Sequence, residues 1–393
     1  MPTRARPKRS SGDHAPTTLI TGATGFLGRN LLYRLLEADE TSRYALLVRG
    51  SETSSPRKRL QRLLVGKYGD ERTAELTKRI DLVMGDVSWE HFGLDDRSYE
   101  ALAANTHRII HAAASVAFAL PLEQARTINV GGTKHILDFA SACGKHGDFE
   151  RLDYIGTAFV AGDRAGTVLE DELDCGQHFH NTYEQTKFEA EKLVREHWKD
   201  LPITIHRPSI VVGESKTGKT SSFNVLYFPL KIYARGLWRW IPGSPSTEVD
   251  IVPIDYVCDA VLGLSRDPST LGRCFHVTSS DHSTTIGRAA EMASHYFAQK
   301  PVRFFPPSFY MNVIHRSVVV GTLPFPRLHD TLINKGSLYL PYFLMNFHFD
   351  DRNARSVLEP HGIRAPKAEE YFAQIFQYAI DTEWGKKLPD RGD

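Results

Sequence analysis

Tyr183 and Lys187 are the residues whose types and spacing most directly suggest chemistry. They stand four positions apart in the polar segment Asn181–Glu191, so a helix would place the phenol and the ammonium on one face. A nearby ammonium favours the phenolate, which predicts a lowered pKa for Tyr183 and a phenol that exchanges protons near neutral pH. Because Tyr-x-x-x-Lys also arises by chance in helices, its meaning depends on the residues around it.

Thr157 supplies a hydroxyl that such a pair could use. It follows Arg151–Ile155, which has the length and composition of a strand. A threonine here either hydrogen-bonds a substrate oxygen where a cofactor site opens, or caps the next turn, which is a common role. Thr157, Tyr183 and Lys187 together, downstream of a dinucleotide-binding turn, predict a hydride-transfer site.

The dinucleotide-binding turn is Thr21–Gly28. It follows the apolar run Thr18–Ile20 and leads into Arg29–Leu36, whose leucines recur at helical spacing. A strand, a glycine turn and a helix in that order are typical of a pyrophosphate site at a helix start, although a glycine-rich turn without a ligand is the alternative. The glycines allow a tight turn, close approach of the pyrophosphate, and close packing of helix on strand. The residues expected to bind the cofactor here are Gly22, Thr24, Gly25, Phe26, Leu27 and Gly28.

Two arginines predict which dinucleotide binds. An acidic residue that holds the ribose of NAD is expected after the second strand, but the run Tyr44–Val48 is followed by Arg49. Arg29 directly follows the last glycine of the turn. Two guanidinium groups suit a 2′-phosphate, so NADPH is the expected cofactor. The alternative is that both are ordinary surface arginines.

Strands and helices alternate along the chain. This alternation predicts an α/β fold, a Rossmann-type doubly wound parallel sheet, with a smaller, mostly helical substrate-binding region built from later segments. The runs that read as strands are Ile80–Val87, Arg108–Ala114, Arg151–Ile155, Leu201–Val212, Glu248–Val252 and Arg273–Thr278, and those that read as helices are Pro121–Ala142 and Asp255–Leu264.

The expected domain boundaries follow changes in composition. Residues 1–16 read as a disordered basic tail, and residues 17–283 as an NADP-binding domain in which 206–250 contribute substrate loops. Residues 284–393 read as a C-terminal substrate-binding or auxiliary region, because aromatic and proline-rich segments gather there. These segments either form an additional core, line a site for an apolar substrate, or contact a membrane at its surface.

Bulk composition narrows the class of protein. In 393 residues, 41% are hydrophobic and 24% charged, as in ordinary globular proteins, and the net charge of +1 gives no reason to expect a nucleic acid partner. No apolar run reaches membrane-spanning length. The four cysteines are scattered, which predicts reduced thiols, no metal site and a cytoplasmic location, with membrane association at most at the periphery.

Two further patterns have competing interpretations. The strand run ending in His111 leads into Ala112, Ala113 and Ala114, small residues that leave room for a cofactor at the sheet edge. His111 is either a catalytic base or, more commonly, a hydrogen-bonded core histidine. Gly213–Thr220 fits the phosphate-loop pattern G-x-x-x-x-G-K-T, but it lies late in the chain and a better-supported nucleotide turn precedes it. We therefore expect a loop beside the substrate rather than an ATPase.

Taken together, these segments resemble the extended short-chain dehydrogenase/reductases, and within them the thioester-reductase and fatty acyl-CoA reductase family. The resemblance covers roughly residues 17–280. The matching segments are Thr21–Gly28, Leu47–Gly50, Gly85–Val87, His111–Ala114, Asn129–Thr133, Thr157–Ala158, Tyr183–Lys187 and Arg207–Gly213.

The resemblance implies roles for the matching residues. Thr157 and Tyr183 would hold the substrate carbonyl oxygen, with Tyr183 protonating it, and Lys187 would bind the nicotinamide ribose. Asn129 would relay protons, or equally would be a structural hydrogen-bonding residue. Further cofactor contacts are implied at Asp86, Val87, Ala112, Ala113, Ala114, Pro208 and Ile210.

The implied activity is an NADPH-dependent reduction of a fatty acyl thioester, on CoA or on an acyl carrier protein, by a monomer or homodimer. The aldehyde would form first, and a second reduction would give the primary alcohol. Two alternatives stay open. One is a dehydrogenase or epimerase of a sterol, sugar nucleotide or other secondary alcohol, and the other is a catalytically silent NADP-binding scaffold.

Overall fold

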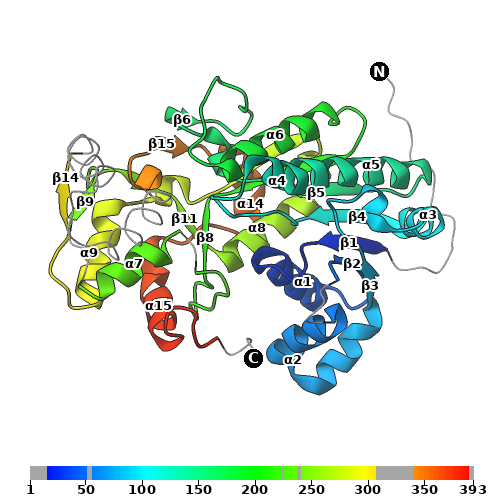
Figure 1. Cartoon of the computed structure of the whole chain (residues 1–393), viewed down its shortest axis with the longest axis horizontal. Helices are drawn as coiled ribbons and strands as arrows, with labels where there is room; N and C mark the ends of the chain where they lie inside the picture. The colour runs from blue at the N-terminus through cyan, green and yellow to red at the C-terminus, as the bar shows by residue number, and fades with distance from the viewer. Residues whose placement is uncertain (1–15, 51–54, 224, 237–239, 307–339, 389–393) are drawn as a thin grey trace.

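The computed structural model describes residues 16–50, 55–223, 225–236, 240–306 and 340–388 (Figure 1). A central sheet of seven parallel strands runs through it, in the order β12-β7-β5-β4-β1-β2-β3. Its strands are β1 (Thr17–Thr21), β2 (Arg43–Val48), β3 (Ile80–Met84), β4 (Thr106–His111), β5 (Arg151–Ile155), β7 (Ile203–Pro208) and β12 (Arg273–Val277).

The strand order reverses beside β1. The chain proceeds from β1 outward through β2 and β3, then returns to form β4 on the other side of β1. Leu19 of β1 accordingly lies opposite Ala45 of β2 and Ile109 of β4. Ligands of open α/β sheets bind at the carboxyl ends of the strands where the order reverses, so this topology places a binding crevice after Thr21 and His111. The predicted Rossmann-type sheet is confirmed.

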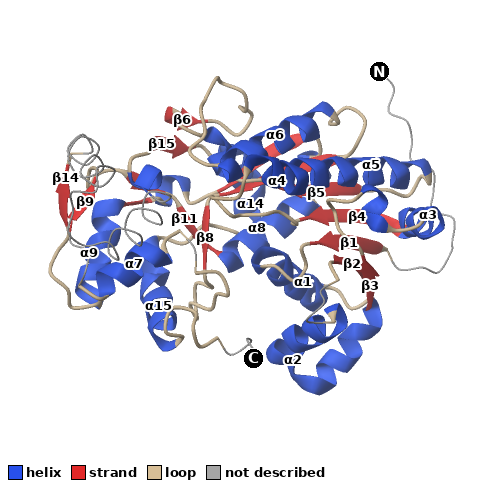
Figure 2. Cartoon of the chain, in the orientation of Figure 1, coloured by secondary structure: helices blue, strands red, loops and turns tan. Residues whose placement is uncertain are grey.

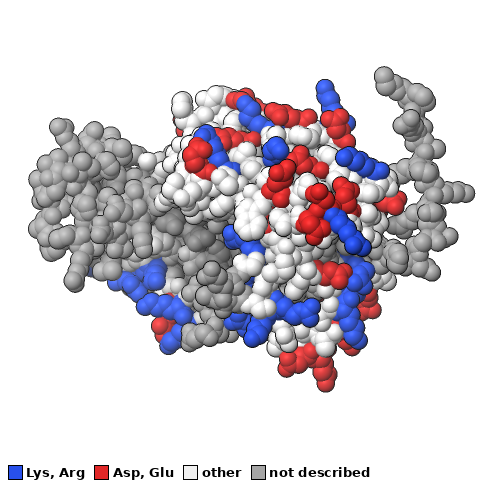
Figure 3. All heavy atoms as spheres, turned by 45° about the vertical axis from the view of Figure 1, so that its right-hand side comes forward, with Lys and Arg blue, Asp and Glu red and all other residues white. Residues whose placement is uncertain are grey.

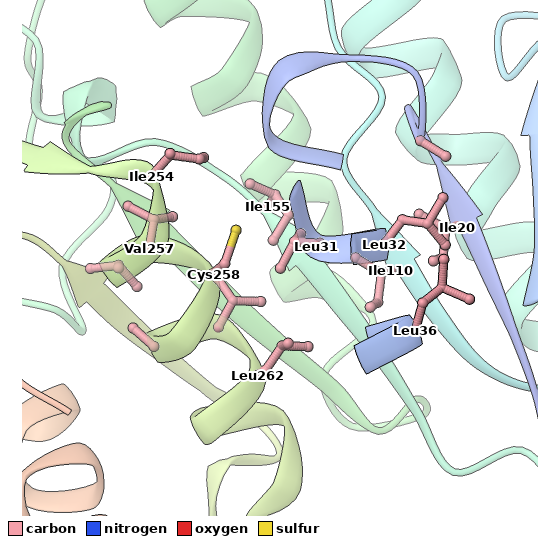
Figure 4. Packing of buried hydrophobic residues seen from close by; sticks show 14 of the residues in the cluster. Ile20, Leu31, Leu32, Leu36, Ile110, Ile155, Ile254, Val257, Cys258 and Leu262 are labelled. Atoms are coloured by element: carbon pink, nitrogen blue, oxygen red, sulfur yellow. The ribbon is translucent and has the colours of Figure 1, made fainter. Parts of the chain in front are cut away.

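Helices cover both faces of the sheet (Figure 2). Because successive strand residues point to opposite faces, Ile20 packs on one side and Leu19 on the other. The first side is covered by α1 (Phe26–Ala38), α2 (Pro56–Leu76), α8 (Ile254–Arg266) and α14 (Arg352–Leu358), and the second by α3 (Asp96–Asn105), α5 (Gly132–Lys145) and α6 (Thr182–Glu196). Figure 4 shows the first of these cores, where Leu31 of α1 and Cys258 of α8 pack near Ile155.

A third core lies beyond the sheet and is built largely from later segments. Its helices are α7 (Tyr227–Ala234), α9 (Ile286–Tyr296) and α15 (Ala368–Asp381). Short strands pair around it: β6 (Ala165–Val168) with β15 (Asn346–Phe349), β8 (Ile210–Val212) with β11 (Ile251–Pro253), β9 (Trp240–Pro242) with β14 (Arg303–Phe305), and β10 (Glu248–Val249) with β13 (Thr284–Thr285).

Two predicted strands are each divided in the structure. Leu201–Val212 forms β7 and then, after Ser209, β8, which leaves the main sheet to pair with β11. Glu248–Val252 forms β10 and β11 with Asp250 between them. The buried Asp250 carboxylate accepts the Ser209 hydroxyl and the backbone N–H groups of Ser279 and Ser280. These bonds replace ladder hydrogen bonds, so the breaks coincide with one polar junction.

The predicted helix Pro121–Ala142 is also interrupted. It begins as α4 (Leu122–Arg126), continues through a π-helical turn at Thr127–Gly131 and becomes α5. Such turns are often found at functional sites, and this one contains Asn129. The remaining short 3₁₀ turns are Thr77–Arg79, Glu90–Gly93, Ala158–Ala161, Pro268–Thr270, Ser280–His282, Leu340–Phe343 and Glu359–His361.

The C-terminal segments return to the main sheet through Glu170. This buried carboxylate accepts the backbone N–H groups of His276 of β12 and of Asn353 and Ala354 of α14. Burial raises the Glu170 pKa to about 7, although these three bonds act in the opposite direction. Helix α14 thus belongs to the core of the sheet while α15 belongs to the third core. The expected boundary at residue 284 stays a prediction.

The described residues bear on some of the expectations about segments, surface charge and cysteines. Residues 1–15 of the basic tail and residues 307–339 of the aromatic C-terminal region lie outside the described residues. Among the described helices, none combines the length and apolar character needed to cross a membrane. Acidic and basic side chains are interspersed on the face drawn in Figure 3. All four cysteines are unpaired, as their spacing predicted.

Candidate active site

The glycine turn is pressed against the end of β4. Gly22 has a φ of +71°, and a Cβ added there would lie 2.7 Å from the carbonyl carbon of Ala112. A Cβ on Gly28 would lie 2.7 Å from the carbonyl carbon of Gly22, so helix and turn approach as closely as backbone allows. Gly25 begins α1 without a side-chain cap. The first N–H groups of α1 therefore stand at the crevice with the arrangement that suits a pyrophosphate.

His111 is part of the support for this turn. Its Nδ1 lies 2.8 Å from the Thr21 hydroxyl, which also accepts the backbone N–H of Ala113 at 3.2 Å. Burial, with a smaller contribution from the Lys187 charge, lowers the His111 pKa to about 3. The ring is therefore neutral at physiological pH and engaged in the core, which favours the structural interpretation over the catalytic base.

This buried histidine predicts a sensitivity to acid. Its pKa is about 3 in the folded chain and about 6.5 when unfolded, so the unfolded chain binds the extra proton between these values. Stability contributed by neutral His111 is present above pH 6.5 and is lost as the pH falls. Between pH 7 and pH 5, the free energy of unfolding of the parent should fall because of this group. In His111→Gln the fall over the same pH interval should be smaller by about 2 kcal/mol. Urea titrations at both pH values measure the free energy of unfolding of each chain. An equal fall in the parent and in His111→Gln would contradict the prediction. So would an equally reduced fall in His178→Gln, in which the replaced histidine is exposed.

Lys187 is buried and points to the end of β5. Its Nζ donates to the carbonyl oxygen of Ile155 at 2.8 Å and lies 4.4 Å from the centroid of the Tyr154 ring. Burial lowers the Lys187 pKa to about 7, and the Glu191 charge offsets only part of this. Lys187 thus lies at the carboxyl end of β5 with an ammonium that loses its proton easily, and its contact with a nicotinamide ribose stays a prediction.

Tyr183 differs from the expectation in its acidity. Burial raises its pKa to about 12, while a hydrogen bond with the Thr157 hydroxyl lowers it and the Glu184 charge raises it. The predicted lowering by Lys187 is wrong, because that ammonium is directed to the Ile155 carbonyl and the Tyr154 ring. A phenol with this pKa is protonated at neutral pH, and its role as a proton donor stays a prediction.

Thr157 has the capping role considered for it, and its role at a substrate oxygen stays a prediction. Its hydroxyl oxygen caps the Ala158–Ala161 turn by accepting the N–H of Phe159 at 3.3 Å, and it lies 3.5 Å from the carbonyl oxygen of Pro208. The same hydroxyl hydrogen-bonds Tyr183. The structure therefore brings the two expected oxyanion donors together at the carboxyl ends of β5 and β7.

Asn129 uses its amide to join three elements. Its Oδ1 accepts the Ser115 N–H at 2.8 Å, and its Nδ2 donates to the Ser115 carbonyl at 3.1 Å and to the Thr186 hydroxyl at 2.9 Å. These bonds link the loop after β4, the π-helical turn and α6. They support the structural role for Asn129, and the proton relay stays a prediction.

The two arginines expected at the 2′-phosphate lie in the β1–α1–β2 unit and directly after it. Arg29 lies in the first turn of α1 and is half-buried. Arg49 is exposed directly after β2, and its carbonyl accepts the Arg59 guanidinium at 2.7 Å. Both stand at the carboxyl edge of the sheet, where the cofactor prediction needs them.

The other expected cofactor residues line the same edge. Asp86 follows β3 and accepts the backbone N–H and the hydroxyl of Ser88, both at 2.8 Å. Val87 is buried against Gly132, and Ala112 to Ala114 follow β4 with increasing exposure. Pro208 ends β7 and Ile210 opens β8, both buried. These placements agree with the predicted site, and binding at each position stays a prediction.

The phosphate-loop pattern does not form a phosphate loop. The backbone N–H of Gly213 donates to the Tyr227 hydroxyl. The backbone N–H groups of Glu214 and Gly218 donate to the carbonyl oxygens of Lys219 and Glu214, respectively. Gly218 has a φ of +68° and packs against α15 rather than opening into a helix. A phosphate loop needs free N–H groups before a helix start, so this geometry supports the earlier interpretation of the motif as misleading.

An apolar cavity lies near the first turn of α6, which its lining residue Tyr342 contacts through Glu184. It measures about 90 Å³, and all its lining residues are apolar or aromatic. They include Ile210, Leu230, Ala289, Tyr342 and Phe372. The Tyr342 ring also stacks on Phe118, whose ring centroid is 5.9 Å from that of Tyr183. A wall of the cavity thus reaches the catalytic helix.

Sequence reasoning did not single out Glu184 or Tyr342. Glu184 is fully buried next to Tyr183 and accepts the Tyr342 hydroxyl at 2.7 Å. Asn181 and Glu184 do have the spacing of a helix capping box, so half of this arrangement was readable from the chain. Nothing local in sequence indicated the contact with Tyr342, which lies 158 residues later.

A buried ion pair joins the catalytic helix to β7. Arg207 donates from Nε to Glu191 Oε2 at 2.9 Å and from Nη2 to Oε1 at 2.7 Å, with both side chains almost fully buried. Burial favours a higher pKa for Glu191, and the Arg207 guanidinium outweighs it and holds that pKa below its usual value. The pair fixes α6 against the strand that carries Pro208.

The sequence profile of the family described as male sterility protein, an NAD-binding family, matches residues 20–261. The chain belongs to this family. The family comprises male sterility and thioester reductase proteins with the extended short-chain dehydrogenase/reductase fold, which confirms the resemblance, and its domain binds NAD(P).

Relatives of this male sterility family member include named reductases. The fatty acyl-CoA reductase wat of Drosophila melanogaster is 26% identical over 431 residues, covering 93% of this chain and 80% of that protein. The nonribosomal peptide synthetase asaC of Aspergillus flavus is 30% identical over 269 residues, and this chain spans only 26% of its length. The chain thus spans about a quarter of the length of the first of these curated synthetases and most of the length of the fatty acyl-CoA reductase.

Solved structures agree with the fold. The terminal R domain from the myxalamid PKS-NRPS biosynthetic pathway is 26% identical, with a TM-score of 0.76 over 96% of this chain and 93% of that one. UDP-glucuronic acid 4-epimerase from Bacillus cereus is 16% identical, with a TM-score of 0.64 over 94% of this chain and 98% of that one. The second likeness concerns the fold alone.

Proposed function

We propose that the chain is an NADPH-dependent reductase of fatty acyl thioesters, carried on CoA or on an acyl carrier protein. The observation that carries this proposal is a protonated Tyr183 close to Thr157, on a helix that Tyr342 connects to an apolar cavity. A phenol that keeps its proton at neutral pH favours reduction over oxidation, because reduction needs a donor at the carbonyl oxygen. A cavity with apolar walls suits an acyl chain better than a sugar nucleotide.

The chain's own groups account for the steps other than hydride supply. A reduced nicotinamide cofactor held along the glycine turn supplies the hydride. Thr157 and Tyr183 hydrogen-bond the thioester oxygen and stabilise the negative charge that develops on it. Tyr183 gives its proton to that oxygen, which yields a hemithioacetal. The C–S bond then breaks, the thiol leaves with the hydroxyl proton, and an aldehyde remains. A second reduction at the same groups would give the primary alcohol.

An assay with NADPH and a ladder of acyl-CoAs, together with the same acyl groups on carrier protein, tests the proposal. We expect one NADPH oxidised per free thiol released when the product is the aldehyde, and two per thiol when the product is the primary alcohol. Turnover of ketones or secondary alcohols without thiol release would instead support the dehydrogenase or epimerase alternative. Absence of both cofactor oxidation and thiol release would reject a reductase.

Cofactor preference gives a separate prediction at Arg49. Its guanidinium is exposed after β2, and pairing with a 2′-phosphate would favour NADPH over NADH. We expect Arg49→Asp to raise the KM for NADPH by about tenfold or more, through lost attraction and added repulsion, and to leave the KM for NADH nearly unchanged. Steady-state kinetics with both cofactors measure this. The exposed Arg57→Asp is the charge-matched control, and equal effects on both cofactors would contradict the assignment.

A further inference from the structure

The first turn of α6 is closed by a capping box that contains Tyr183. Asn181 precedes the helix, and its Oδ1 accepts the Glu184 N–H at 3.0 Å. The Glu184 carboxylate reaches back, accepting the Asn181 amide at 3.1 Å and the backbone N–H of His180 at 2.9 Å. Tyr183 lies between these two residues, so the box fixes the backbone from which its phenol projects.

Tyr342 joins this box from a distant part of the chain. Its hydroxyl donates to Glu184 Oε1 at 2.7 Å and accepts the Asn181 Nδ2 at 3.1 Å. The hydroxyl therefore contacts both side chains that define the first turn of α6. Because the Glu184 side chain is fully buried, water cannot readily replace a lost partner there.

The ring of Tyr342 makes a second, apolar connection. It stacks on Phe118 at 5.6 Å between centroids and meets Phe159 edge-on at 5.1 Å. Phe118 in turn lies against the Tyr183 ring, and Phe159 is two residues beyond Thr157. The same Tyr342 ring forms part of the wall of the apolar cavity. One side chain thus contacts the cavity, the capping box and the surroundings of both hydroxyl donors.

We propose that Tyr342 is a positioning residue for Tyr183: its hydroxyl, held by Glu184 and Asn181, keeps the first turn of α6 in the geometry that aims the catalytic phenol at the substrate carbonyl. An acyl chain in the cavity would rest against the ring that carries this hydroxyl. The C-terminal region therefore contributes to catalysis as well as to binding. The role of the cavity rests on the proposed function, whereas the contact with the capping box does not.

Another buried tyrosine shows why this contact is specific. Tyr371 donates its hydroxyl to the carbonyl of Ile251 at 2.9 Å and belongs to the same third core. It makes no hydrogen bond to α6 among the bonds of the described residues. Tyr371→Phe therefore removes a buried phenol hydroxyl from the same region without touching the capping box, and serves as a matched control.

The test compares Tyr342→Phe with Tyr371→Phe in the full chain. Tyr342→Phe keeps the stacked ring and the cavity wall but removes the hydroxyl. We expect its kcat for thioester reduction to fall by about tenfold to a hundredfold while the KM for acyl substrate and for NADPH changes little, since misplacement of a reacting group lowers the chemical step. Deuterium uptake of residues 180–188 should rise in Tyr342→Phe and stay unchanged in Tyr371→Phe.

Glu184→Gln provides the second variant. If Tyr342 acts through the negative charge of the Glu184 carboxylate, which the amide lacks, the double variant should lose little more activity than either single variant, because both changes weaken the same hydrogen bond. A fall in kcat below about fivefold for Tyr342→Phe, or an equal fall in Tyr371→Phe, would overturn the proposal. If the parent chain reduced no thioester, the proposed function would fail, and the deuterium uptake would still decide the role of Tyr342.

Discussion

Replacing Tyr183 by Phe is expected to lower kcat for thioester reduction by about a thousandfold, the loss typical for removal of a general acid. The phenol is protonated at neutral pH, hydrogen-bonds Thr157 and has no neighbouring phenol on α6 that could replace it. The dissociation constant for NADPH should change little, because the ring stays in place. Stopped-flow hydride transfer and a cofactor binding titration measure the two effects separately.

Tyr44→Phe is the control for this prediction. Its hydroxyl donates to the Leu35 carbonyl at 3.0 Å, away from the site, so kcat should be preserved. A Tyr183→Phe variant that keeps most of the parent activity would remove Tyr183 from the mechanism. If that variant bound NADPH normally and kept the full biological effect of the chain, the scaffold alternative would be favoured.

Replacing Arg207 by Leu is expected to destabilise the fold by about 3–5 kcal/mol. The reason is the Glu191 carboxylate, which would be left buried with one remaining cation, Arg195, at 2.9 Å. Arg207 also donates to the carbonyl of Glu172 at 2.8 Å, and that acceptor would keep only the longer bond from Arg195 at 3.5 Å. Urea unfolding followed by far-ultraviolet circular dichroism measures the change.

A partly exposed pair between α4 and α6 serves for comparison. Arg126 donates to both carboxylate oxygens of Glu189, at 2.9 and 2.8 Å, but both side chains are partly exposed. Arg126→Leu should cost about 1 kcal/mol or less, because solvent can replace the lost partner. Equal losses for Arg126→Leu and Arg207→Leu would show that burial does not decide the difference.

Local patterns predicted the parts of the fold that depend on local physics. The glycine turn could be placed because its strand–turn–helix context is local, and Gly28 packs closely on Gly22; the contact of Gly22 with Ala112 is a tertiary one. The parallel sheet followed from the alternation of strand and helix patterns, and the structure confirms it. The spacing of Tyr183 and Lys187 correctly indicated a helix, α6.

Features that depend on side-chain direction or on distant segments could not be predicted. Sequence spacing put Lys187 on the same helix face as Tyr183, but its ammonium is directed to the Ile155 carbonyl, so the predicted pKa shift had the wrong sign. The division of the Leu201–Val212 run depends on Asp250, some forty residues downstream of Ser209. Tyr342 joins the site only through tertiary packing.

The hydrogen bonds of Glu170 have a consequence for the order of synthesis. The chain completes all seven strands of the sheet once Val277 has been made, yet two of the three backbone donors to this buried carboxylate belong to Asn353 and Ala354. A nascent chain that has passed β12 therefore has a finished set of strands and a carboxylate whose desolvation is largely uncompensated. Late in translation the sheet should stay open near Glu170, and the arrival of α14 should act as the step that commits the chain to its compact state.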